Sequence, residues 1–209
     1  MVGIYDCFGY GGSFDVSFED RYKLIKWAGF DCVMLWWSDK FGRGTGYQED
    51  VRLAQNAGLE IENMHTPVHE QNHLSSDDLN GESVYQTYLQ CVEDCVDFHI
   101  PTMVIHLPDD QYPVNELVLN RLQNIIHKAE NEEIQIAFEN LANINNLDRV
   151  LNTFQSKFVG YCYDSCHHQN HASDIDLLNK YGKRLMALHL QDNGGKHNQH
   201  QLPFDGNID

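Results

Sequence analysis

The chain has 209 residues, which is enough for one domain with a sizeable hydrophobic core. Its apolar fraction of 42% is ordinary for a globular protein, and no run approaches the ~20 apolar residues that cross a membrane. With 31 Asp and Glu against 14 Lys and Arg, the formal net charge is -17, which repels phosphate backbones and disfavours nucleic acid as a partner. The first residues lack a secretion signal, so we expect a cytoplasmic protein.

Apolar runs of strand length alternate with segments of helical period along the chain. In chain order, the predicted strands are 2–5, 31–37, 59–65, 102–107, 134–139, 158–163 and 184–190. The helices predicted between them are 18–28, 47–57, 81–98, 114–130, 146–154 and 174–181. Ser17 or Ser13 is expected to cap the first helix, and Gly29 and Gly58 are expected to end the first two.

This alternation predicts a parallel sheet with crossover helices, and seven repeats in one domain predict a (β/α)8 TIM barrel. The chain has no glycine-rich nucleotide-binding fingerprint. We interpret residues 1–209 as a single (β/α)-barrel domain. The eighth strand is missing from the pattern, so we expect a chain that is truncated at its C-terminus.

Side chains that can bind metals stand at the ends of five consecutive predicted strands: His65, His106, Glu139, Asp164 and His189. In such barrels the carboxyl ends of all strands meet at one mouth. A titratable group at the end of a buried strand is costly unless it is paired or bound to a metal. The pattern therefore predicts a divalent-metal site. Its imidazole and carboxylate donors favour manganese or zinc, with cobalt, magnesium or iron as alternatives.

Other residues have two interpretations. Trp36 and Trp37 end the second strand, so one should face the barrel mouth and the other the helix layer. We take Trp36 as a candidate for substrate binding, together with His65 and with His69 in the following loop. The six cysteines are interpreted as reduced structural thiols. Among them, Cys162 and Cys166 flank Asp164 at even spacing and are interpreted as packing residues.

Several segments together resemble the xylose isomerase-like TIM barrels, a superfamily of sugar phosphate isomerases and epimerases that also contains apurinic-site endonucleases. The matching segments are His65-Thr66-Pro67, His106-Leu107-Pro108, Phe138-Glu139-Asn140, Asp164-Ser165-Cys166-His167, the run 189–195 and the closing run 200–209. Their order and their placement at strand ends make the resemblance specific.

The resemblance implies roles for these residues. In the sugar isomerases and epimerases, counterparts of Glu139, Asp164 and His189 bind one divalent ion, and a glutamate on the eighth strand, which has no counterpart here, completes the site. In the endonucleases, counterparts of His65, His106, His167 and His200 hold further zinc ions. An aspartate that also binds zinc there corresponds to Asn198, and His197 is a possible replacement for it.

The resemblance thus implies a metal-dependent isomerase or epimerase that acts on a small sugar or sugar phosphate through an enediolate. Glu139 is the candidate base, and His106 and His167 would move protons or hold substrate hydroxyls. We expect Glu139→Gln to reduce turnover while leaving metal-free stability unchanged or raised, because negative charges crowd there. The alternatives are a zinc-dependent endonuclease and a non-catalytic sugar- or metal-binding barrel. A homo-oligomer is also compatible with the sequence.

Overall fold

The computed structural model describes residues 1–6, 16–38, 47–195 and 199–208. Seven strands form one parallel sheet, in which each strand pairs with the next along the chain. They are β1 (Gly3–Tyr5), β2 (Cys32–Trp36), β3 (Glu60–His65), β4 (Thr102–Ile105), β5 (Gln135–Glu139), β6 (Val159–Asp164) and β7 (Leu185–His189). The predicted order and type of all seven strands are confirmed.

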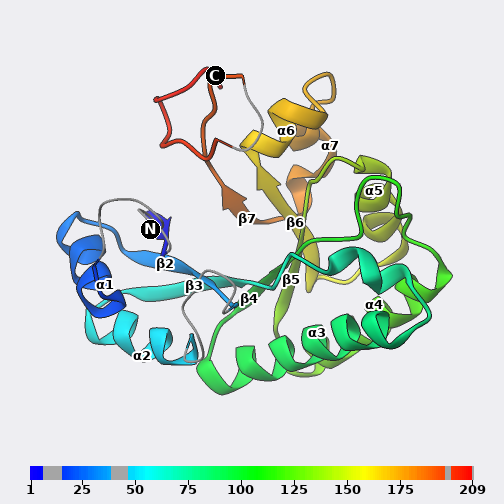
Figure 1. The fold of residues 1–209 in the computed structure, drawn as a ribbon, viewed down its shortest axis with the longest axis horizontal. Helices are drawn as coiled ribbons and strands as arrows, with labels where there is room; N and C mark the ends of the chain where they lie inside the picture. The colour runs from blue at the N-terminus through cyan, green and yellow to red at the C-terminus, as the bar shows by residue number, and fades with distance from the viewer. Residues whose placement is uncertain (7–15, 39–46, 196–198, 209) are drawn as a thin grey trace.

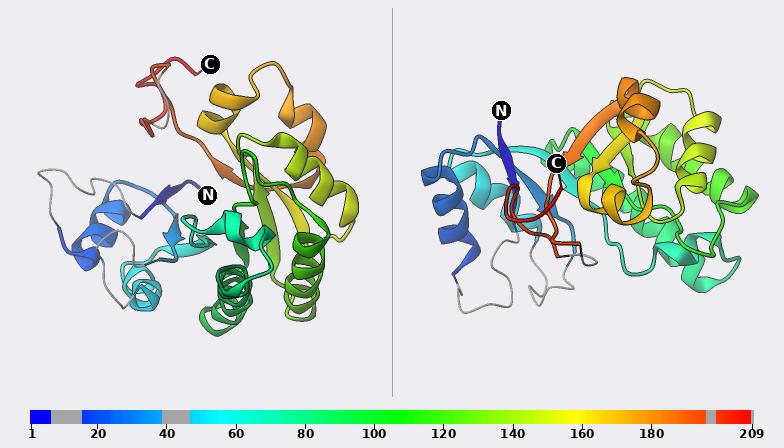
Figure 2. Two further views of the ribbon diagram at one scale, coloured as in Figure 1. Left: turned by 45° about the vertical axis from the view of Figure 1, so that its right-hand side comes forward. Right: turned by 90° about the horizontal axis from the view of Figure 1, so that it is seen from above.

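Helices follow the strands, and most of them cover the convex side of the curled sheet, while α6 lies at the carboxyl end of β6 (Figures 1 and 2). They are α1 (Phe18–Trp27), α2 (Gln48–Asn56), α3 (Leu79–Phe98), α4 (Glu116–Asn131), α5 (Ile144–Thr153), α6 (Ser165–His171) and α7 (Leu177–Tyr181), with 3₁₀ turns η1 (Gln71–Ser75) and η2 (Gly182–Arg184). None of the described helices is long and apolar enough to cross a bilayer. The sheet and helices form the greater part of a TIM barrel, with β1 and β7 as its two ends.

The local signals at the helix ends act largely as predicted. The Ser17 side chain accepts the N–H of Asp20 and so caps α1, whereas Ser13 lies outside the described residues. Gly29 and Gly58 have φ of 95° and 83°, a conformation that ends a helix at little cost only for glycine.

Two helices differ from the prediction. The predicted helix 174–181 is shorter because Asp176 caps it by accepting the N–H of Asn179. The helix α6 was not predicted, because its seven residues are mostly polar and lack an apolar period. It forms because the Asp164 side chain accepts the N–H of His167 at 2.7 Å.

The hydrophobic core lies mainly between the sheet and its helices, and a smaller cluster fills the inside of the barrel. The two neighbouring tryptophans divide between these regions. Trp37 points outward, where its ring N–H donates to Asp94 of α3 at 2.6 Å. Trp36 stacks on His65 with ring centroids 4.9 Å apart. The expectation that one tryptophan faces each side is therefore confirmed.

Hydrogen bonds fix the loops at the mouth to one another. The Asn146 amide donates to the carbonyls of Pro108 and Tyr112, at 2.6 and 2.9 Å, and its oxygen accepts the N–H of Val114 at 2.9 Å. Asp109 accepts the N–H of Asn143 at 2.7 Å. These contacts tie the loop after β4 to the start of α5 along this wall of the mouth.

The segment after β7 is organised by one buried carboxylate. Asp192 accepts four backbone N–H groups at 2.8 to 3.0 Å, from Asn193, Phe204, Gly206 and Ile208. Its backbone also pairs with Gln201 in an antiparallel bridge. These bonds hold the segment 199–208 as a defined loop beside the mouth.

Candidate metal centre

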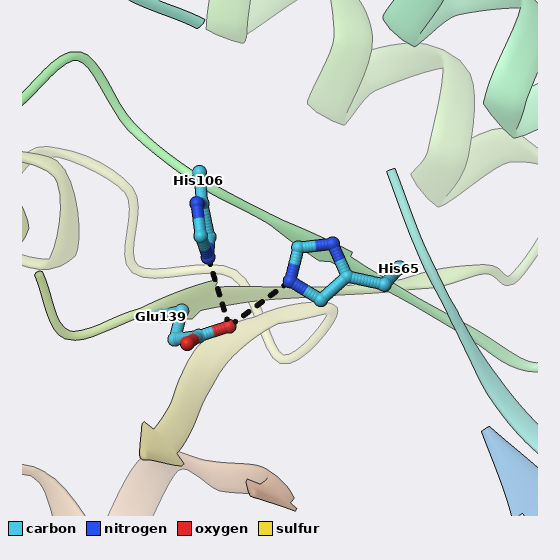
Figure 3. A group of neighbouring side chains, drawn as sticks. All are labelled: His65, His106 and Glu139. Atoms are coloured by element: carbon cyan, nitrogen blue, oxygen red, sulfur yellow. Dashed lines mark hydrogen bonds and ion pairs between the residues drawn. The ribbon is translucent and has the colours of Figure 1, made fainter. Parts of the chain in front are cut away.

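The carboxylate of Glu139, at the end of β5, stands at the centre of four histidines. Its Oε2 lies 3.2 Å from His65 Nε2, 3.2 Å from His106 Nε2 and 3.0 Å from His189 Nδ1, and its Oε1 lies 3.0 Å from His167 Nδ1. Figure 3 shows the rings of His65 and His106 directed at the same carboxylate oxygen. The glutamate is 2% exposed, so it has little access to water.

The second carboxylate, Asp164, is positioned by Asn140. The Asn140 amide donates to the carbonyl of Asp164 at 2.9 Å, and its oxygen accepts the backbone N–H of Asp164 at 2.8 Å and the hydroxyl of Tyr161 at 2.8 Å. One Asp164 oxygen accepts the side-chain amide of Gln191, and the two oxygens lie 3.9 Å from His167 Nδ1 and 4.0 Å from His189 Nδ1. Apart from Tyr161 inside β6, each of these residues ends a strand or lies beyond the carboxyl end of one.

The hydrogen bonds of His65 show which of its nitrogens is available. Its Nδ1 lies 2.8 Å from the carbonyl oxygen of Thr66, which can only accept, so Nδ1 carries the proton. In the neutral ring the Nε2 lone pair then faces Glu139 Oε2. Two acceptors repel at this distance unless a proton or a cation lies between them. This arrangement suits a metal ligand whose other nitrogen is held by the protein.

His189 supports the same conclusion. While its Nδ1 faces Glu139, its Nε2 is buried and has no hydrogen-bond partner among the described residues. Unpaired buried polar atoms are rare and costly in folded proteins. Three overlapping groups have ligand atoms within 4.8 Å of one another: His65–His106–Glu139, Glu139–Cys162–His189 and Glu139–Asp164–His167. The residues present therefore fit a divalent cation.

The crowding of charges shifts the pKa values of the group. Burial disfavours the charged form of Glu139, yet His189, His106 and His167 hold its pKa well below the ordinary value. Burial lowers the pKa of His106 to about 4. For His167 burial acts in the same direction, but the hydrogen bond to Glu139 and the charge of Asp164 raise its pKa to about 9. Burial, with the charge of Glu139, raises the pKa of Asp164.

A family model described as the xylose isomerase-like TIM barrel matches residues 22–209. The chain belongs to this family. Among curated proteins it is 26% identical to the uncharacterized protein y4fM of Sinorhizobium fredii (strain NBRC 101917 / NGR234), over 94% of this chain and 75% of that protein.

Solved structures agree with the assignment. A D-tagatose 3-epimerase-like protein superposes with a TM-score of 0.75 at 19% identity, over 100% of this chain and 82% of that one. The IOLI protein with a bound zinc atom gives a TM-score of 0.73 at 16% identity, over 100% and 81%. At these identities the likeness establishes the fold of the xylose isomerase-like barrel.

Most of the predicted site residues of this barrel are brought together. His65, His106, Glu139, Asp164 and His189 lie at one mouth, where His167 joins them from α6. Their roles as ligands and catalysts stay predictions.

The remaining candidates lie further out. Trp36 reaches the group through its stacking on His65, and His69 is exposed in the loop after β3. His200 is exposed with φ of 48° and is in none of the three groups. His197, Asn198 and Cys7 lie outside the described residues.

A small pocket of about 180 Å³ opens beside the centre. His106 and His167 line it together with Gln71, Asp109, Leu141, Ala142 and His171. The supporting roles of Asn140, Gln191 and Asp109 were not predicted from the sequence. Each lies one to four residues beyond the carboxyl end of a strand, and this position was the available signal.

Proposed function

We propose that this chain is a divalent-metal-dependent isomerase or epimerase that acts on a small sugar or sugar phosphate. The observation that carries the proposal is the Glu139 carboxylate, which is buried at the mouth of the barrel among four imidazoles and beside Asp164. Glu139, Asp164 and His189 would hold the ion, with His65 and its fixed tautomer next to them. The solved neighbours described as epimerase-like and as zinc-bound support the same chemistry.

A bound divalent ion would supply a Lewis acid that stabilises negative charge developing on a carbonyl oxygen and its neighbouring hydroxyl. The chain's own residues must then remove the proton from the hydroxyl-bearing carbon next to the carbonyl. The Oε2 atom of Glu139 is crowded by three ring nitrogens, whereas Oε1 has the single close ring contact to His167. Oε1 is therefore the atom that would accept the proton.

The pocket beside the centre supports roles for two histidines. His106 and His167 both line it, so a substrate seated there would touch their rings. His167 Nδ1 lies 3.0 Å from Glu139 Oε1, and because its pKa is raised to about 9 the ring would carry a proton near neutral pH that it could donate to a substrate oxygen. Trp36, stacked on His65, would offer an apolar face to the sugar ring at the mouth.

Proton exchange tests this proposal directly. The metal-loaded protein should incorporate deuterium from heavy water into the carbon next to the carbonyl of D-tagatose, another ketohexose or a phosphorylated counterpart. Metal-stripped protein should not. Glu139→Gln should lose at least ~10²-fold in rate, the lower end of what a positioned general base contributes. His127→Asn, on an exposed part of α4, is the matched control and should keep the parent rate. Absence of exchange with every sugar would overturn the proposal.

A further inference from the structure

A thiol lies next to the two central ligands on the inside of the barrel. The parallel register places Cys162 of β6 between Glu139 of β5 and Ala187 of β7. Its neighbour in the strand, Tyr161, belongs to the core under the helices, so Cys162 faces the barrel interior. The side chain is fully buried and packs with Val104 and with small alanines.

The atoms around this thiol are metal ligands rather than ordinary packing partners. A Glu139 carboxylate oxygen, the Cys162 sulfur and a ring nitrogen of His189 all lie within 4.8 Å of one another. The same His189 ring has a buried Nε2 without a hydrogen-bond partner among the described residues. A cation between the three groups would bind a ring nitrogen of His189 and neutralise the carboxylate.

The other cysteine of this segment provides the contrast. Cys166 is equally buried, but its sulfur accepts side-chain amide N–H groups from Asn193 at 3.2 Å and Asn170 at 3.5 Å. It also lies outside all three candidate ligand groups. Cys166 is therefore a structural residue, as the sequence analysis interpreted both thiols, and Cys162 departs from that interpretation.

We propose that Cys162 is a thiolate ligand of the ion held by Glu139 and His189, which makes the centre selective for zinc and cobalt over magnesium and manganese. Thiolate favours softer ions, whereas carboxylates and water suit the harder ones. On binding, the S–H bond breaks, a sulfur–metal bond forms and the proton leaves to solvent. The inference rests on the metal centre of the proposed function.

Cobalt spectroscopy tests the sulfur ligand without any substrate. The protein is stripped of metal by a chelator, kept reduced, and loaded with one equivalent of Co²⁺. A thiolate ligand gives a sulfur-to-cobalt charge-transfer band in the near ultraviolet, whereas imidazole and carboxylate ligands alone give only the weaker visible bands. The parent and the matched control Cys166→Ser should show the charge-transfer band. Cys162→Ser should lose it and keep the visible bands.

The possible results separate the inference from the function that it rests on. Visible bands without the charge-transfer band in the parent would overturn the role of Cys162 while leaving the metal centre intact. A charge-transfer band that survives Cys162→Ser would assign the sulfur to another cysteine and also overturn it. Failure of the parent to bind cobalt at all would overturn the metal centre and, with it, this inference.

Competition with a chelator supplies a second measurement. Cys162→Ser should weaken zinc binding by at least about tenfold, since even partners outside the coordination shell change metal affinity by about 10–100-fold. Manganese binding should change much less, because sulfur contributes little to it. Equal losses for the two ions would contradict the proposed selectivity. Melting of the metal-free variants, compared with Cys166→Ser, checks that the fold is retained.

Discussion

The pairing of Glu139 with His167 predicts a pH-dependent stability of the metal-free protein. Glu139→Gln keeps the size of the side chain but removes the charge that faces His167 Nδ1 at 3.0 Å. Despite burial, the hydrogen bond to Glu139 and the charge of Asp164 raise the pKa of His167 from 6.5 to about 9. At ~1.36 kcal/mol for each tenfold change in proton affinity, this shift corresponds to about 3 kcal/mol, an upper limit for what the variant loses through this pair.

The direction of this pH dependence follows from the linkage between proton binding and folding. The folded protein binds the His167 proton more tightly than the unfolded chain does, so this contribution is fully present below the unfolded pKa of 6.5. It is lost as the pH rises through the folded value of about 9. The variant should therefore be less stable than the parent near about pH 6, and the difference should vanish by about pH 10.

Chemical denaturation of the metal-free proteins at these two pH values measures the difference. The exposed Glu60, at the start of β3, provides a matched control, because Glu60→Gln removes a carboxylate far from any histidine pair. This control should match the parent at both pH values. An equal loss of stability for Glu139→Gln at low and high pH would refute the reasoning, since the pair with His167 could then not be its cause.

Four further predictions concern the metal, the loop after β7 and nucleic acid. Adding zinc to metal-stripped protein should raise the melting temperature, because an ion at about a hundred times its Kd stabilises the native state by about 2.7 kcal/mol; an unchanged temperature would contradict the metal site. Asp192→Asn should speed hydrogen exchange of the N–H groups of Phe204 and Ile208. Backbone hydrogen bonds lower the pKa of Asp192, so in the parent this protection holds above the ordinary value of 3.8 and is lost as the pH falls through the lower folded one. Gly206→Ala should loosen the same amides, since its Cβ would lie 2.3 Å from an Asp192 oxygen, whereas Gly182→Ala meets nothing within 4 Å and should be neutral; equal effects would argue against the steric reason. Incision of abasic-site DNA should not exceed that of a metal-stripped control, because few cations are available for phosphate contacts.

The gathering of the ligands at one mouth could be predicted from the sequence for a physical reason. Strands of a parallel barrel all point the same way, so the residues that end them meet regardless of the loops between them. His65, Glu139 and His189 each end an observed strand, and their separation in the sequence did not matter.

The identity of the central residue could not be predicted, because it depends on the register between strands. Glu139 lies opposite Cys162, while Asp164 lies one level further along, opposite His189. The pairing of β6 with β7 shifts its register between Tyr161 and Cys162, and this shift brings His189 opposite Asp164. No feature of the local sequence predicts the shift.

The expected effect of Glu139→Gln on stability shows the consequence. The sequence places the carboxylates of Glu139 and Asp164 at the ends of neighbouring strands. This placement predicted crowded negative charge and a Glu139→Gln variant at least as stable as the parent. The structure instead surrounds Glu139 with four imidazoles, which reverses the expected sign near neutral pH.

The Asn140 side chain makes two hydrogen bonds to the backbone of Asp164, and these extend the pairing of β5 with β6 beyond Glu139. Since the amide binds both the N–H and the carbonyl of Asp164, the two carboxylate-bearing strand ends are joined directly to each other and not through the loops that follow them. Insertions or exchanges in those loops would leave this connection unchanged. In such a scaffold, substrate preference can diverge through loop replacement while the pair of carboxylates is inherited intact.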